Sequence, residues 1–142
     1  MKTIQLSIYC DGGARGNPGP AASAFVVQDS SGKILHEQGF YLGPTTNNQA
    51  EYEAVIQALK WVSTLHNSSF NIHFFLDSLL VVNQLKGLYK VKNQNLLSKF
   101  SAIKELIIQY SIFNIQYSYI PRAQNFRADL LVNQTLDSEA EK

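Results

Sequence analysis

The segment IQLSIYCD, residues 4–11, alternates between apolar and polar side chains until it reaches an aspartate. Such alternation places every second residue on one face, which is typical of a β-strand with one buried side. The residues on the apolar face are Ile4, Leu6, Ile8 and Cys10. We therefore predict a first strand that ends at Asp11.

Short turns follow this strand and connect it to two more. The run GGARGNPGP, residues 12–20, is rich in Gly and Pro, and SSGK, residues 30–33, is typical of a hairpin. Residues 24–27 and 34–42 have the apolar character of strands. Because the connections are short, we expect these first three strands to pair antiparallel.

Helices separate the later strands. A helix is expected over about residues 48–65, where apolar residues recur at helical spacing. The other expected elements are strands at 72–76 and 112–120, and helices at about 78–86, at 94–110 and from Asn125 or Phe126 onward. Strands joined through helices pair in parallel. The sequence thus predicts an α/β fold: a mixed five-stranded sheet, three antiparallel strands and then parallel ones, with helices packed on it.

Length and composition indicate one domain. The 142 residues are 45% hydrophobic and 16% charged, as in ordinary soluble proteins. We expect a folded domain over residues 1–136 and an acidic, disordered tail over 137–142. No apolar run approaches the roughly 20 residues of a membrane span, and the first residues do not resemble a signal peptide. The single cysteine, Cys10, excludes an internal disulfide. We expect a cytoplasmic monomer without membrane contact.

Positive charge is concentrated in one segment, although the net charge is only +1. Residues 78–104 contain no Asp or Glu. The lysines of this segment are Lys86, Lys90, Lys92, Lys99 and Lys104. Such a segment is a candidate surface for contacting phosphates. A solvated helix face is the alternative, and composition alone does not separate the two.

Four acids stand at the ends of predicted strands or near the beginnings of predicted helices, and each has an ordinary explanation. Asp11 begins an Asp-Gly turn pair. Glu51 lies three residues after Asn48, as in a helix capping box. Asp77 could cap the following helix, and Asp129 could interact with the dipole of the last helix.

Two of these acids fit their ordinary explanation poorly. Glu51 shares a helix face with Val55 and Ala58, so its carboxylate would point along the apolar side. Asp77 follows the apolar residues 74–76, at the end of a buried strand, where functional sites gather in sheets with crossover helices.

If the four carboxylates meet, their charges must be compensated. Two carboxylates about 4 Å apart repel by roughly 4 kcal/mol at an effective dielectric constant near 20. A cluster of four therefore requires cations or strongly shifted pKa values. Carboxylates are hard oxygen ligands, and no Cys or His pattern nearby suggests zinc. The implied cation is Mg²⁺, with Mn²⁺ as a substitute.

From about Ile4 to Leu136, the chain resembles ribonuclease H type 1. The matching motifs are YCDGGARGNPGP at 9–20, TNNQAEY at 46–52, Asp77-Ser78 with Val81, Val82, Gln84 and Gly87, and NFRAD at 125–129. Each motif contains one of the four acids. The resemblance implies the ribonuclease H-like fold, in a short form without a basic handle or an N-terminal hybrid-binding domain.

The resemblance also implies an endonuclease that hydrolyses the RNA strand of RNA–DNA hybrids with two Mg²⁺ ions. Asp11, Glu51, Asp77 and Asp129 would be both the catalytic residues and the metal ligands. By the same resemblance, Asp11 bridges the two ions, Asp129 helps to hold the ion that activates water, and Glu51 and Asp77 hold the ion at the leaving 3′ oxygen. The products would carry 5′-phosphate and 3′-hydroxyl ends.

Substrate contacts are also implied by the resemblance. The glycine-rich loop would bring its backbone close to RNA 2′-hydroxyls, and Thr46 would contact a phosphate of the DNA strand. Asn17, Asn47 and Gln49 would contact the minor groove. For the two asparagines, ordinary turn chemistry is the alternative. The expected substrate-binding residues are Gly12, Gly13, Ala14, Gly16, Asn17, Thr46, Asn47, Gln49, Lys86, Lys90 and Lys92.

The chain departs from the family pattern in one catalytic detail. Many members carry a His in the loop before the last Asp, but residues 121–128 contain none. Arg122 is the best-placed substitute. It cannot act as a base, since its pKa exceeds about 12, but it could steady a phosphate or ease product release. A surface arginine is the alternative.

Three other functions stay open at this point. The first is an inactive or weakly active module that binds hybrids or double-stranded RNA. The second is a nuclease that acts mainly on double-stranded RNA, which also offers 2′-hydroxyls. The third is a structural or interaction role. The presence of all four acids favours an active nuclease.

Overall fold

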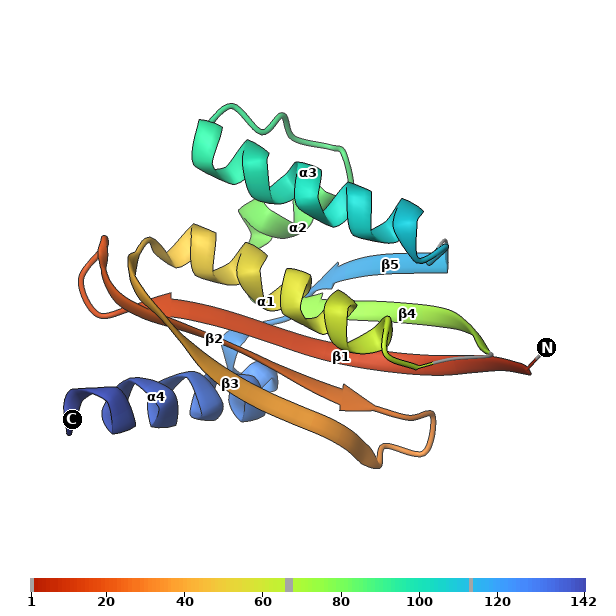
Figure 1. Ribbon diagram of the computed structural model, residues 1–142, viewed down its shortest axis with the longest axis horizontal. Helices are drawn as coiled ribbons and strands as arrows, with labels where there is room; N and C mark the ends of the chain where they lie inside the picture. Colours follow the sequence, from red (N-terminus) through yellow and green to blue (C-terminus); the bar gives the residue numbers. More distant parts are fainter. Residues whose placement is uncertain (1, 66–67, 113) are drawn as a thin grey trace.

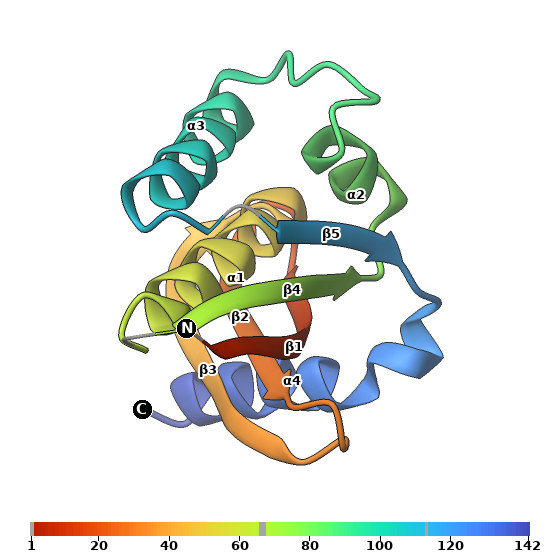
Figure 2. The same cartoon turned by 90° about the vertical axis from the view of Figure 1, so that its right-hand side faces the viewer.

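A computed structural model describes residues 2–65, 68–112 and 114–142, which form one sheet with helices on both faces (Figures 1 and 2). The strands are β1 (Lys2–Ala14), β2 (Gly19–Gln28), β3 (Ile34–Thr45), β4 (Ser68–Leu76) and β5 (Asn114–Tyr119). The helices are α1 (Asn47–Val62), α2 (Leu79–Leu85), α3 (Gln94–Gln109) and α4 (Phe126–Ala140), with a 3₁₀ turn, η1, at Arg122–Asn125.

The sheet has the mixed topology that the sequence predicted. The strand order is β3-β2-β1-β4-β5. The pairs β1–β2 and β2–β3 are antiparallel, whereas β1–β4 and β4–β5 are parallel. The short turns account for the antiparallel half. The helices between the later strands account for the parallel half.

Strands β1 to β4 are longer than predicted, whereas β5 is shorter, and β1 in particular does not end at Asp11. It continues to Ala14, paired with β2 as far as Ala21. The prediction was wrong because Gly and Ala give no apolar–polar alternation, although their backbones pair normally. The expected strand at 112–120 is observed as β5, and Phe113 lies outside the described residues.

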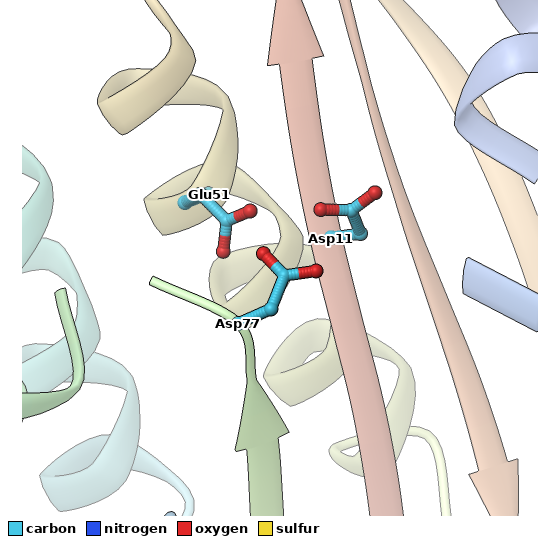
Figure 3. Close-up of side chains that lie close together, drawn as sticks. All are labelled: Asp11, Glu51 and Asp77. Atoms are coloured by element: carbon cyan, nitrogen blue, oxygen red, sulfur yellow. The ribbon is translucent and has the colours of Figure 1, made fainter. Parts of the chain in front are cut away.

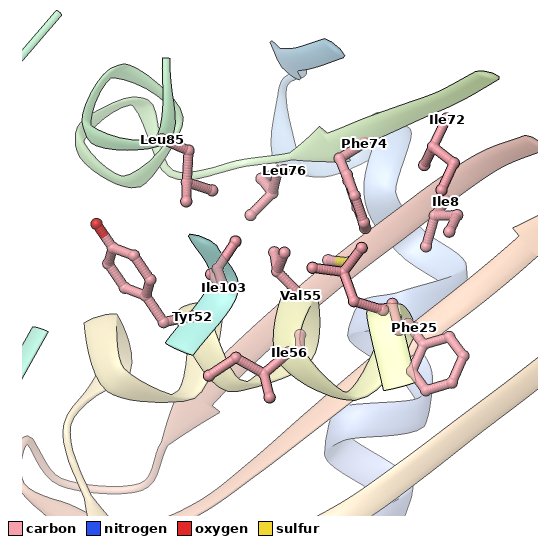
Figure 4. Packing of buried hydrophobic residues seen from close by; sticks show 14 of the residues in the cluster. Ile8, Phe25, Tyr52, Val55, Ile56, Ile72, Phe74, Leu76, Leu85 and Ile103 are labelled. Atoms are coloured by element: carbon pink, nitrogen blue, oxygen red, sulfur yellow. The ribbon is translucent and has the colours of Figure 1, made fainter. Parts of the chain in front are cut away.

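The main core lies between α1 and one face of the sheet. The side chains that alternate along β1, Leu6, Ile8 and Cys10, are buried on this face. They pack with residues of α1 and β4 such as Val55 and Phe74 (Figure 4). Helices α2 and α3 lie on the same side as α1 (Figure 2). Burial of apolar side chains contributes about 1.5–3 kcal/mol for each fully buried residue of Leu or Phe size.

Helix α4 covers the opposite face of β1, β2 and β3 (Figures 1 and 2). Val132 and Leu136 pack against Ala22 and Ala24 of β2, where the small alanines let the helix approach closely. Gly39 of β3 also allows a close approach, since a Cβ there would lie 2.4 Å from Oγ1 of Thr135. This packing fixes the helix that carries Asp129.

The end of the chain differs from the disordered tail expected over residues 137–142. Helix α4 continues to Ala140, so only the last two residues follow it. Leu136 is buried in the contact with β2, which extends helical packing to the border of the expected tail. Asp137 accepts a hydrogen bond from Arg15 at 2.6 Å, which ties the helix to the β1–β2 connection. None of the described helices is long and apolar enough to cross a membrane.

Candidate metal centre

Three of the four acids meet at one edge of the sheet (Figure 3). Asp11 lies on β1, Glu51 on α1, and Asp77 directly after β4. One carboxylate oxygen from each lies within 4.8 Å of the other two. The two strands bring their acids together because β1 and β4 are parallel and adjacent. The prediction that acids from separate elements meet is therefore confirmed for these three.

Glu51 is not part of a capping box. Helix α1 begins at Asn47 and its N-cap is Thr46, whose side chain accepts from the backbone N–H of Gln49 at 3.2 Å. The predicted start at Asn48 was one residue too late, so Glu51 lies beyond the first turn. Its Oε1 accepts from the backbone N–H of Gly12 at 3.1 Å. Its buried Oε2 has no hydrogen-bond partner within residues 2–65, 68–112 and 114–142.

Asp77 does not cap the following helix. The N-cap of α2 is Ser78, whose side chain accepts from the N–H of Val81 at 3.3 Å. The half-buried Asp77 carboxylate is left to accept a hydrogen bond from Nδ2 of Asn125 at 3.2 Å. It therefore faces Asp11 and Glu51 rather than its own helix (Figure 3).

Asp129 lies in the first turn of α4, as predicted. It lines the same hollow of about 420 Å³ as the other three acids. It does not belong to the group whose oxygens lie within 4.8 Å of one another. All four predicted acids thus line one hollow. Asp11, Glu51 and Asp77 form a tight group there, and Asp129 lies outside that group.

Burial raises the pKa values of the three clustered acids. Asp11 and Glu51 are 3% and 4% exposed. Desolvation raises the pKa of Asp11 from 3.8 to about 7, and the charges of Asp77 and Asp129 act in the same direction. Desolvation and the charge of Asp11 raise the pKa of Glu51. Burial also raises the pKa of Asp77, opposed by the Asn125 hydrogen bond and by the charge of Arg122.

The sequence and the structure match one family. A family model described as reverse transcriptase-like matches residues 9–135. The ribonuclease HI of Halobacterium salinarum is 40% identical over 133 residues, which are 94% of this chain and 65% of that protein. The structure of LC11-RNase H1, isolated from compost, is 42% identical with a TM-score of 0.89, covering 96% of this chain and 98% of that one. The chain belongs to the ribonuclease H type 1 family.

Two of the relatives bear on function and extent. LC11-RNase H1 has also been solved in complex with an RNA/DNA hybrid, and that structure has a TM-score of 0.87 to this chain at 42% identity, covering 95% of this chain and 99% of that one. The bifunctional protein Rv2228c of Mycobacterium tuberculosis is 37% identical over 97% of this chain but 37% of that protein. The chain therefore spans less than two thirds of both the Halobacterium and the mycobacterial protein.

The connection between α2 and α3 is direct, as expected for a chain without a basic handle. Residues 86–93 join α2 to α3 and contain no further helix. Lys86, Lys90 and Lys92 are exposed on this connection. Their role as phosphate contacts stays a prediction.

Several expected substrate-binding residues also make internal contacts. Thr46 and Gln49 form the cap of α1. Oδ1 of Asn17 accepts from the backbone N–H of Asn47 at 2.9 Å, and Oδ1 of Asn47 accepts from the N–H of Ala14 at 2.8 Å. These two bonds join the end of β1 and the β1–β2 connection to the start of α1. They use only the amide oxygens, so both Nδ2 groups stay available as donors.

The glycine-rich segment has two different structural roles. Gly16, in the loop, has a φ of 88°, a conformation that side chains disfavour. Gly12 and Gly13 lie in β1, and a Cβ on Gly12 would lie 2.2 Å from the backbone carbon of Ala50. Gly12 thus has no side chain because α1 packs directly against it, a structural role beyond the backbone contact with RNA that the family resemblance implies.

Arg122 lines the acid hollow from η1. This is the place expected for a residue that replaces the loop His. Asn125, at the end of the same turn, was missed as a site residue although it stands in the quoted NFRAD motif. Its signal in the sequence is a polar residue directly before the helix that carries Asp129.

The residues fit a divalent cation. The clustered ligand atoms are all carboxylate oxygens, the donors that Mg²⁺ and Mn²⁺ prefer. Glu51 presents a buried oxygen without a partner among the described residues, and such an atom is costly unless a ligand uses it. Burial and the neighbouring carboxylates raise the pKa values of Asp11 and Glu51, and a bound cation would offset both effects.

We expect divalent-metal affinity to fall as the pH is lowered below about 7. In the metal-free protein Asp11 holds a proton below its raised pKa of about 7, and a metal must displace it. Displacement of one proton weakens binding about tenfold for each pH unit. Titration of Mn²⁺ by calorimetry between pH 5.5 and 8, in two buffers of different ionisation enthalpy, measures both the affinity and the protons released. An affinity that is constant over this range would contradict the raised pKa.

Proposed function

We propose that this chain is an endonuclease that hydrolyses the RNA strand of RNA–DNA hybrids, using divalent metal ions held by the acid cluster. The observation that carries the proposal is the cluster itself: three carboxylates within 4.8 Å, one of them with a buried oxygen that lacks a partner in the described chain. The complex of LC11-RNase H1 with an RNA/DNA hybrid supports this substrate class.

We infer that the site takes two Mg²⁺ ions, with Mn²⁺ as a substitute. Asp11, Glu51 and Asp77 would hold one ion, and Asp11 with Asp129 would hold the second. Bound ions of this kind polarise a phosphate, lower the pKa of water and stabilise the leaving oxygen in an in-line displacement. The products would carry 5′-phosphate and 3′-hydroxyl ends.

The protein's own residues orient these ligands and the substrate. Gly12 fixes one oxygen of Glu51, and Asn125 fixes one oxygen of Asp77. The Nδ2 groups of Asn17 and Asn47, which make no hydrogen bond within the described residues, suit donation to RNA 2′-hydroxyls. Arg122, on the hollow wall, suits a phosphate oxygen. All four acids of the hollow come from one chain, so the site needs no residue from a second copy, and we propose that the chain acts as a monomer.

Cleavage assays with defined duplexes test the proposal. A hybrid with labelled RNA should be cut in Mg²⁺ or Mn²⁺ and left intact in EDTA, and its fragments should carry 3′-hydroxyl ends. Double-stranded RNA and double-stranded DNA of the same sequence serve as controls. Faster cutting of double-stranded RNA would favour the alternative nuclease. Binding of the hybrid without cutting in any metal would favour a binding module.

A further inference from the structure

Asn125 is a buried polar residue at the junction of the acid-bearing segments. It is 1% exposed and stands at the end of η1, as the N-cap residue of α4. Four residues later the same helix carries Asp129. A buried amide needs hydrogen-bond partners, so the groups to which Asn125 is bonded indicate its role.

The amide nitrogen of Asn125 bridges the other two strands of the site. Nδ2 donates to the backbone carbonyl of Cys10 at 2.8 Å, directly before Asp11, and to Oδ2 of Asp77 at 3.2 Å. One side chain thus connects β1, the end of β4 and the start of α4. These are the segments that carry Asp11, Asp77 and Asp129.

The other half of the amide makes no compensating contact. Asn is a favoured N-cap residue because its oxygen accepts from the helix N–H groups, yet Asn125 makes no such side-chain bond. Its buried Oδ1 has no partner in the part of the chain that the structure describes. Exchanging the two amide atoms would set Oδ1 against two acceptors, so the orientation is fixed by Cys10 and Asp77. In this orientation Asn125 donates two hydrogen bonds, but its side chain does not cap α4 and its Oδ1 accepts no hydrogen bond from the described residues.

We propose that Asn125 is a positioning residue for the metal centre, which holds the Asp77 carboxylate toward Asp11 and Glu51. A hydrogen bond to one oxygen of Asp77 limits rotation of the carboxylate and leaves its other oxygen for the metal. The bond to Cys10 sets the distance between Asp77 and the strand that carries Asp11. This inference rests on the proposed function, since it assumes that the cluster binds a divalent metal.

Direct binding of Mn²⁺ to the protein without nucleic acid tests the inference. Loss of a residue that orients a metal ligand typically weakens metal affinity 10–100-fold. We expect this loss in Asn125→Ala, and also in Asn125→Leu, which replaces the amide with an apolar group of similar volume. In cleavage assays the same variants should need about tenfold more Mg²⁺ for half-maximal rate, with activity restored at high Mg²⁺.

A matched control separates positioning from general stability. Gln84 is also buried, at 5% exposed, and accepts a hydrogen bond from the Tyr52 hydroxyl at 2.6 Å without contacting an acid of the site. Gln84→Ala should lower the melting temperature and leave Mn²⁺ affinity within about twofold. If the affinity of Asn125→Ala and Asn125→Leu is as little changed, the inference is overturned.

A double-mutant cycle separates an effect on Asp77 from a general loss of stability in the Asn125 variants. In an Asp77→Asn background, Asn125→Ala should reduce Mn²⁺ affinity no further, because its effect passes through the carboxylate that has been removed. Additive losses would overturn the inference while leaving the proposed function intact. A wild-type protein that binds no Mn²⁺ and cuts no hybrid would overturn the proposed function itself.

Discussion

Asp11→Asn is expected to reduce hybrid cleavage by on the order of 10³-fold or more. The substitution keeps the size and shape of the side chain but removes a carboxylate from the middle of the acid cluster. A catalytic metal contributes several kcal/mol of transition-state stabilisation, and each 1.36 kcal/mol corresponds to about tenfold in rate. Single-turnover cleavage of a labelled hybrid in saturating Mg²⁺ measures the loss.

The same substitution should make the metal-free protein more stable at neutral and higher pH. The pKa of Asp11 is raised from 3.8 in the unfolded chain to about 7 in the folded one. A raised pKa means that stability is fully present below about 3.8 and is lost as the pH rises through about 7. At 1.36 kcal/mol per pKa unit, the loss is on the order of 4 kcal/mol at pH 8. Asparagine carries no charge, so the Asp11→Asn variant does not lose this stability as the pH rises.

Thermal denaturation in EDTA at pH 5 and pH 8 distinguishes this explanation from a general effect of removing negative charge. The wild type should lose stability toward pH 8, Asp11→Asn should lose less, and Mg²⁺ should restore the wild type alone. Glu105→Gln removes an exposed carboxylate from α3 and is the control, expected to follow the wild type in activity and in pH dependence. Equal cleavage by wild type and Asp11→Asn would contradict the assignment of the site.

Sequence periodicity was sufficient to predict the sheet but not the lengths of its strands. Alternation from Ile4 to Cys10 gave the buried face of β1, and the turn residues gave the antiparallel half. The extension of β1 through Gly12 and Gly13 was missed, because residues without large side chains produce no periodic signal. The helical run after Asp137 was missed because acids at a helix C-terminus oppose the helix dipole.

The positions of the acids could be predicted because strand ends and helix faces depend on local pattern. The contacts that orient them could not, since they join residues far apart in the chain. The bond from Asn125 to Asp77 spans 48 residues, and that from Gly12 to Glu51 spans 39. The N-cap of α1 shows a smaller failure of the same kind. Both Thr46-x-x-Gln49 and Asn48-x-x-Glu51 are acceptable caps by sequence, and the structure has the first.

Gly12→Ala is expected to destabilise the protein by about 3 kcal/mol or more, the upper end of the cost of overpacking. A Cβ on Gly12 would lie 2.2 Å from the backbone carbon of Ala50, 2.4 Å from its oxygen and 2.5 Å from the nitrogen of Glu51. All three are backbone atoms of α1, so no side-chain rotation can relieve the contact. Either β1 or the whole helix must move, against a core packed on both.

Chemical denaturation of Gly12→Ala and Gly13→Ala provides a matched comparison. The two glycines are neighbours in β1, but within the described residues a Cβ on Gly13 would meet one atom, Cγ1 of Val132, at an ordinary 3.8 Å. Gly13→Ala should therefore change the free energy of unfolding by less than about 1 kcal/mol. Equal stability of the two variants would mean that α1 shifts at little cost.

Because Glu51 follows Ala50 directly and accepts from the N–H of Gly12, such a shift would carry Glu51 away from Asp11. A stable Gly12→Ala variant should then bind Mn²⁺ more weakly than Gly13→Ala.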